Sequence, residues 1–167
     1  YGLGDLETAI SQLRIAADRS DRFLKAREMI SLILFQQQRF NESIAEAQKI
    51  IEVDPNNVLA RVILGDAYTA KGDPDMALGE LKEITEKNPN FANAFIKMGA
   101  LYYQKGEMGE TEEALKGAID AAPASVRPRL VLSGFYLRNG DKDLAQTILK
   151  EGLKGDKDDV PLYVSLA

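Results

Sequence analysis

The sequence of 167 residues contains no cysteine and no histidine. Without thiols, neither a disulfide framework nor a thiolate metal site can form, and either redox compartment is tolerated. The absence of histidine removes the usual general base near neutral pH and the commonest metal ligand. We therefore predict that the chain is not an enzyme and that it has no catalytic residues, no cofactor and no metal site.

Long apolar runs are absent as well. No stretch of about 18 apolar residues occurs, which excludes a spanning helix. The charged residues Asp5, Glu7 and Arg14 lie within the first 20 positions, which excludes an intact signal peptide here. We predict no membrane insertion by this part of the chain. The compartment stays open between the cytoplasm and a periplasmic or envelope-anchored location, which a segment outside this sequence would specify.

Positive charge is in deficit, since 21 Lys and Arg residues stand against 26 Asp and Glu residues, for a net charge of −5. A chain of this charge binds phosphate backbones poorly, so nucleic acid is not an expected partner. With 45% hydrophobic residues, the composition is otherwise that of an ordinary folded protein.

What the sequence does contain is an internal repeat of 34 residues. Three residue types at one period indicate a repeat architecture far more strongly than a single motif does. The series are Pro55, Pro89 and Pro123; Gly72, Gly106 and Gly140; and Tyr68, Tyr102 and Tyr136. In the earliest full repeat, Gln38 occupies the position of the repeated glycine.

Each unit is predicted to form two antiparallel helices, because apolar residues at spacings of three and four continue for about 12 residues and then meet a turn. In such a turn Gly72 suits a left-handed cap, and Pro74 fits the first position of the next helix. Asp73, and Asp141 in a later unit, are predicted to cap the following helix by accepting backbone N–H bonds.

Two further glycines, Gly65 and Gly99, are predicted to keep one helix slim where small residues such as Ala77 and Thr111 approach it. No unit can bury its apolar face alone, so we expect neighbouring units to stack as one continuous solenoid without a domain boundary.

These motifs resemble the tetratricopeptide repeat (TPR) consensus, and the unit 58–91 matches it at Leu64, Gly65, Tyr68, Gly72, Ala77, Leu81 and Pro89. The resemblance implies an all-α fold, a TPR-type right-handed superhelical solenoid of antiparallel helix pairs, similar to long arrays in bacteria. Residues 1–167 are interpreted as one array. Its parts are the second helix of a partial repeat at 1–23, full repeats at 24–57, 58–91, 92–125 and 126–159, and the start of a further repeat at 160–167.

The resemblance also implies a concave face, built from the first helix of each repeat, that holds a peptide or a helix of a partner protein. This sequence lacks the family's clamp for chaperone carboxylates, since Glu28, Val62 and Ile96 stand at clamp positions. The groove pattern instead favours an apolar partner segment, with a few charges that set register. The candidate partner-binding residues are Val62, Ile63, Asp66, Ile96, Lys97, Tyr103, Gln104, Arg127, Leu130 and Arg138.

Two functions follow as alternatives. The first is a protein–protein interaction scaffold or adaptor that uses this groove, although several groove residues would leave it inert if they pack inside the superhelix. The second is a structural spacer or assembly subunit of a bacterial envelope system, for exopolysaccharide or protein sorting, with contacts at the array ends or the convex face. Self-association through an uncapped end at Val160 to Ala167 belongs to this alternative.

Acidic clusters are the remaining candidates for chemistry. Asp156, Asp158 and Asp159 lack the glycine and distant glutamate of a calcium loop. Glu112 and Glu113 lie at the predicted start of a second helix, where carboxylates favour the positive end of the helix dipole. We interpret both groups as structural.

Overall fold

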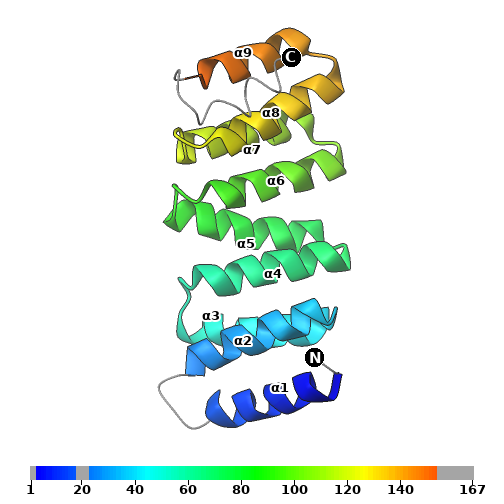
Figure 1. The fold of residues 1–167 in the computed structure, drawn as a ribbon, viewed down its shortest axis with the longest axis vertical. Helices are drawn as coiled ribbons and strands as arrows, with labels where there is room; N and C mark the ends of the chain where they lie inside the picture. The colour runs from blue at the N-terminus through cyan, green and yellow to red at the C-terminus, as the bar shows by residue number, and fades with distance from the viewer. Residues whose placement is uncertain (1–2, 18–22, 154–167) are drawn as a thin grey trace. The chain divides into compact units, whose positions relative to one another are not determined.

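The computed structural model describes residues 3–17 and 23–153, and within them the chain forms nine α-helices and no strand (Figure 1). The predicted all-α architecture is confirmed for these residues. Asp156 to Asp159 and Val160 to Ala167 lie outside the described residues. The helices are α1 Leu3–Ala17, α2 Phe23–Gln36, α3 Phe40–Val53, α4 Val58–Lys71, α5 Pro74–Lys87, α6 Ala92–Lys105, α7 Met108–Ala121, α8 Val126–Asn139 and α9 Lys142–Glu151.

The chain divides into two compact units, Tyr1–Lys87 with α1 to α5 and Asn88–Ala167 with α6 to α9. A continuous superhelix across the division, and the division of the chain into repeats given above, stay predictions.

Three glycines end the first helices of their pairs as predicted. Gly72, Gly106 and Gly140 have φ values of 81°, 77° and 89°, the left-handed conformation that a residue without Cβ adopts at no steric cost. Gln38 takes the equivalent turn with a φ of 60° and is the one non-glycine residue with positive φ in the described part of the chain. Glutamine therefore accepts a conformation that costs it more than it costs glycine.

The repeated prolines also lie where the pattern places them. Pro55, Pro89 and Pro123 each come two residues after the last residue of α3, α5 and α7. A proline has no backbone N–H to continue a helix, so the second helix of each pair ends before it.

The capping prediction is wrong for Asp141. Its side chain makes no capping hydrogen bond, and its backbone, at φ −86° and ψ 62°, is not in the extended conformation of a typical N-cap. Its own N–H instead donates to the carbonyl of Tyr136 at 2.9 Å, which closes the glycine turn. The geometry of the preceding helix end therefore determines this residue's conformation.

In the first unit, the helices of each pair run antiparallel. Arg61, early in α4, donates to Glu80 of α5 at 2.7 Å, while Gly65 one turn later faces Ala77 one turn earlier. A Cβ on Gly65 would lie 3.5 Å from Leu81 Cγ, an ordinary contact. In the α2–α3 pair, the hydroxyl of Ser43 donates to the carbonyl of Ser31 at 2.8 Å. Small residues therefore do mark the close approach of the two helices.

In the second unit the approach is tighter. A Cβ on Gly99 would lie 2.7 Å from Leu115 Cδ2, closer than real carbon atoms come. Leu115 belongs to the core of this unit together with Leu132, Phe135, Tyr136 and Ala145. The side chain of α7 that lies under Gly99 is therefore a buried leucine.

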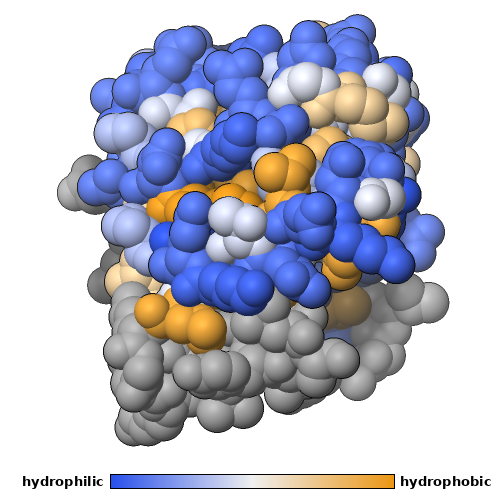
Figure 2. All heavy atoms as spheres, turned by 90° about the horizontal axis from the view of Figure 1, so that it is seen from above, coloured by the Kyte–Doolittle hydropathy of each residue, from blue (hydrophilic) through white to orange (hydrophobic). Residues whose placement is uncertain are grey.

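Apolar surface remains at the end of the second unit where α8 and α9 lie. Seen from that end, hydrophobic atoms form an interrupted band between hydrophilic rims (Figure 2). Leu137 of α8 and Leu144 of α9 are 50% and 48% exposed. No helix within 3–17 and 23–153 is both long and apolar enough to cross a membrane.

Candidate partner-binding groove

The second unit contains an open hollow of about 220 Å³ between its two first helices, α6 and α8. Side chains of α7 form the floor, so all three helices contribute. The lining residues are Ile96, Gly99, Ala100, Tyr103 and Gln104 of α6, Thr111 and Leu115 of α7, and Val131, Phe135 and Arg138 of α8.

Helical periodicity places these residues on facing sides of α6 and α8. Ile96, Ala100 and Tyr103 are four and three residues apart, and Val131, Phe135 and Arg138 repeat those intervals. The small residues Gly99 and Ala100 lower one wall and expose the floor. The hollow is thus a direct result of short side chains on α6 between longer ones.

An aromatic pair forms one part of the wall. The rings of Tyr103 and Phe135 meet edge to face, with centroids 6.1 Å apart and an angle of 85° between the ring planes. This arrangement is among those preferred by aromatic pairs. Phe135 is 6% exposed, whereas Tyr103 is 37% exposed. The buried ring therefore holds the accessible one in a fixed position.

Four of the predicted partner-binding residues line the hollow, namely Ile96, Tyr103, Gln104 and Arg138. Lys97, Arg127 and Leu130 are on the same two helices, outside the lining. Val62, Ile63 and Asp66 are on α4 in the first unit, and Ile63 is only 3% exposed. Ile63 thus offers a partner little surface, and the binding role of all ten residues stays a prediction.

Sequence reasoning missed the floor. Thr111 and Leu115 are 1% and 3% exposed and were not among the predicted binding residues, yet both border the hollow. Phe135 stands where Ala67 and Leu101 stand in earlier units. The exchange of an aliphatic residue for an aromatic ring was the available signal, but comparison with the family consensus gives no weight to this position.

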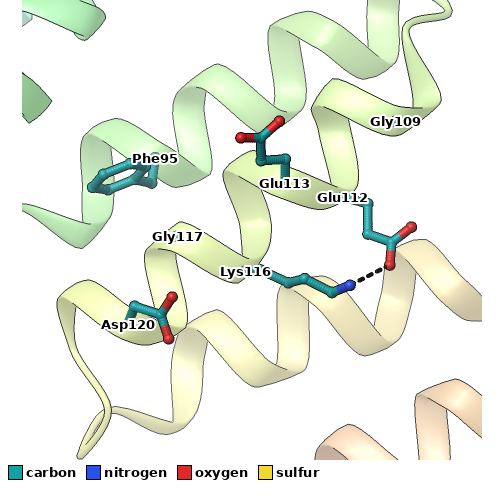
Figure 3. Close-up of a pocket in the computed structure, with 7 residues that line it drawn as sticks. All are labelled: Phe95, Gly109, Glu112, Glu113, Lys116, Gly117 and Asp120. Atoms are coloured by element: carbon teal, nitrogen blue, oxygen red, sulfur yellow. Dashed lines mark ion pairs between the residues drawn. The ribbon is translucent and has the colours of Figure 1, made fainter.

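A second hollow, of about 530 Å³, lies on the outer side of α7 and is lined by Phe95 of α6 with Gly109, Glu112, Glu113, Lys116, Gly117 and Asp120 of α7 (Figure 3). Two of its carboxylates, Glu112 and Glu113, were considered above as candidates for chemistry. The Nζ of Lys116 lies 2.7 Å from Glu112, and the hydroxyl of Tyr136 donates to the same carboxylate at 2.7 Å.

These two hydrogen bonds, that of Lys116 first, hold the pKa of Glu112 below its ordinary value. Glu112 is therefore ionised at neutral pH and lacks the raised pKa of a general acid. Within residues 3–17 and 23–153, no group of three or more His, Cys, Asp or Glu residues could hold a metal ion. We interpret this hollow as a surface feature of α7.

The helix pairs define a helical-repeat architecture. A family model described as "Tetratricopeptide repeat" matches residues 34–101 and 102–167, and a second model of the same description matches residues 1–58. The chain belongs to the tetratricopeptide repeat family. Proteins of this family are generally non-enzymatic scaffolds that bind other proteins.

No curated protein sequence matches the chain. Among solved structures it is similar to MamA, at 22% identity over 90% of this chain and 88% of that one, with a TM-score of 0.75. It is also similar to TTC0263, a thermophilic TPR protein of Thermus thermophilus (22% identity, 98% and 90% coverage, TM-score 0.67). A TPR protein of Parabacteroides merdae matches at 20% identity, 98% and 65% coverage and a TM-score of 0.76. At these identities the likeness shows the fold alone.

Proposed function

We propose that the chain is a scaffold or adaptor that holds a segment of a partner protein in the groove between α6 and α8. The observation that carries this proposal is the open hollow with its apolar floor of Leu115 and its accessible aromatic wall at Tyr103. An apolar pocket with an aromatic rim is the usual seat of an anchoring side chain at a protein interface.

The size of the hollow favours a peptide over a small-molecule ligand. Pockets that enclose small molecules typically have volumes of about 300–1,000 Å³. A hollow of about 220 Å³ that is open along one side suits one or two anchoring side chains, while the rest of the segment lies along the helices. Lys97, Arg127 and Leu130 flank the hollow on α6 and α8 and would contact that remainder.

Site-specific photo-crosslinking tests the proposal. A photoreactive amino acid is placed at Gln104, which is exposed and lines the groove, and as a control at Glu113, which is exposed on the outer side of α7. We expect a distinct crosslinked partner from position 104 in cells and none from position 113. Crosslinks only from the outer face would contradict the groove proposal and favour the spacer alternative.

The identified partner then allows a quantitative test. The Tyr103→Ala/Leu130→Ala variant should bind it at least about tenfold more weakly, because truncation of a central aromatic anchor typically costs more than 1–2 kcal/mol. Isothermal titration measures the affinity, and a circular-dichroism melt confirms that the variant remains folded. Unchanged affinity of a folded variant would mean that the groove is inert.

A further inference from the structure

We propose that the groove's occupant is an acidic peptide segment, with a short apolar run between two carboxylate-bearing ends. The inference rests on the proposed function and adds the chemistry of the partner. It is carried by how charge is distributed over the helices of the second unit.

Charge is segregated between the helices of this unit. The two groove helices carry only cations, two lysines on α6 and three arginines on α8, and neither helix has a single Asp or Glu. The floor helix α7 has the opposite bias, with Glu110, Glu112, Glu113 and Asp120 against one lysine. A chain with a net charge of −5 thus presents a cationic groove. Complementary potentials of this kind select a partner of opposite sign.

The first unit differs in this respect. Its first helices α2 and α4 carry carboxylates at Glu28 and Asp66 beside their cations. Each of these helices has a net charge of +1, against +2 on α6 and +3 on α8, so the excess of positive charge is larger on the groove helices of the second unit.

Two arginines on α8 are available to a ligand. Arg127 and Arg138 are exposed, and no carboxylate pairs with either one in the described ranges 3–17 and 23–153. Two other cations are engaged, since Arg129 donates to the carbonyl of Pro123 at 2.8 Å and Lys105 lies 3.0 Å from Glu107.

The spacing of these two arginines sets the pattern of the ligand. Arg138 comes eleven positions after Arg127, about three helical turns, so both lie on the same side of α8 at a separation of about 16 Å. Val131 lies between them on the same side of the helix and lines the hollow. An extended peptide covers about 16 Å with five residues, so its two carboxylates would flank an apolar run of about that length.

Selection from a random dodecamer peptide library on the 167-residue protein tests the inference. We expect recovered peptides with an excess of Asp and Glu around aromatic or aliphatic residues. Replacing every Glu by Gln in a selected peptide should weaken its binding by about tenfold in low salt, and raising the salt concentration should reduce that difference.

Charge reversal supplies the matched pair of variants. Arg127→Glu/Arg138→Glu should lower the affinity for the selected peptide about tenfold or more and should favour its Glu→Lys version. Lys142→Glu/Lys150→Glu on α9 changes the net charge by the same amount at exposed positions outside the groove and should leave binding nearly unchanged. Melting curves establish that both variants fold.

The outcomes separate the two proposals. Selected peptides that are neutral or basic, yet compete with the crosslinked partner, would overturn the acidic occupant and leave the groove's function intact. An equal loss of affinity in the α9 variant, or tighter binding of a single-stranded oligonucleotide than of any peptide, would also overturn it. A library that yields no groove-dependent peptide, together with no crosslink from position 104, would overturn both.

Discussion

The two units make the same helix-pair contact with different chemistry. At one position of the 34-residue repeat, the first unit has Arg27 and Arg61, and the second unit has Phe95 on α6 and Arg129 on α8. Arg27 donates to Glu46 on α3, and Arg61 donates to Glu80 on α5. Phe95 instead packs against α7 at Gly117, where an added Cβ would lie 2.9 Å from the ring.

In the α8–α9 pair, the arginine at this position keeps only one of the two hydrogen-bond partners that Arg61 has. Arg129 still donates to the carbonyl of Pro123, as Arg61 does to that of Pro55. The glutamate is gone, since Ile148 stands at the position that corresponds to Glu80. This repeat position therefore joins its two helices by an ion pair in α2–α3 and α4–α5 and by an aromatic ring in α6–α7.

Breaking the Arg27–Glu46 ion pair should destabilise the protein more than truncating Phe95. Arg27 and Glu46 are 8% and 4% exposed, so Glu46→Ala leaves a nearly buried guanidinium without this carboxylate. We expect a loss of about 3 kcal/mol in the free energy of unfolding, which urea denaturation measures.

The triple variant Arg27→Phe/Glu46→Ala/Lys49→Gly sharpens the comparison, because it copies Phe95, Ala114 and Gly117 of the second unit. Replacement of a buried pair by apolar residues is often close to neutral, so the lost stability should return except for about 1 kcal/mol from the glycine within a helix. A triple variant less stable than Glu46→Ala would show that the two solutions are not interchangeable.

The helix approach at Gly99 should be less tolerant than the one at Gly65. Gly99→Ala forces Leu115 to move and should cost about 1–2 kcal/mol by overpacking, and Gly99→Leu more. Gly65→Ala meets Leu81 only at ordinary contact distance, so its cost should be smaller.

Gly134→Ala is the matched control, since nothing lies within 4 Å of its Cβ. There the better helix propensity of alanine should raise stability by up to about 1 kcal/mol. Thermal melts of the three alanine variants give the order of their stabilities. Equal losses of stability at positions 65 and 99 would contradict the closer helix approach in the second unit.

Tyrosines at equivalent positions also have different partners. The hydroxyl of Tyr68 accepts from the neutral amide of Gln48 at 3.3 Å, whereas that of Tyr136 donates to the carboxylate of Glu112 at 2.7 Å. Burial, and then this hydrogen bond, raise the pKa of Tyr136 to about 12. Because the folded protein holds this proton more tightly than the unfolded chain does, the resulting stability is fully present below pH 10 and is lost as the pH rises toward 12.

The smallest of the expected effects follows from that pKa. The stability advantage of the parent protein over Tyr136→Phe should fall by about 1 kcal/mol between roughly pH 10 and 12, as measured by urea denaturation. Glu112→Gln gives Tyr136 a neutral partner like that of Tyr68 and should reduce the fall. A constant difference between parent and Tyr136→Phe across this range would contradict the raised pKa.

The turns between helices show which backbone conformations could be predicted from the sequence and which could not. Gly72, Gly106 and Gly140 were predicted correctly because a left-handed turn leaves few alternatives to glycine. Gln38 follows the same backbone path because its position in the repeat, and not its own preference, determines it. Asp141 has the right residue type for a cap, yet the preceding turn gives its backbone another conformation.

The sequence by itself determined the family, the helix pairs and their turns, because these depend on residues that are close along the chain and recur every 34 positions. Only the tertiary structure decided where an accessible hollow exists. It brings Leu115 and Phe135 under the short side chains of α6, and it buries Ile63 while Tyr103 stays exposed. Accessibility depends on what each side chain meets on neighbouring helices, and a 34-residue pattern gives equivalent positions the same role even when their neighbours differ.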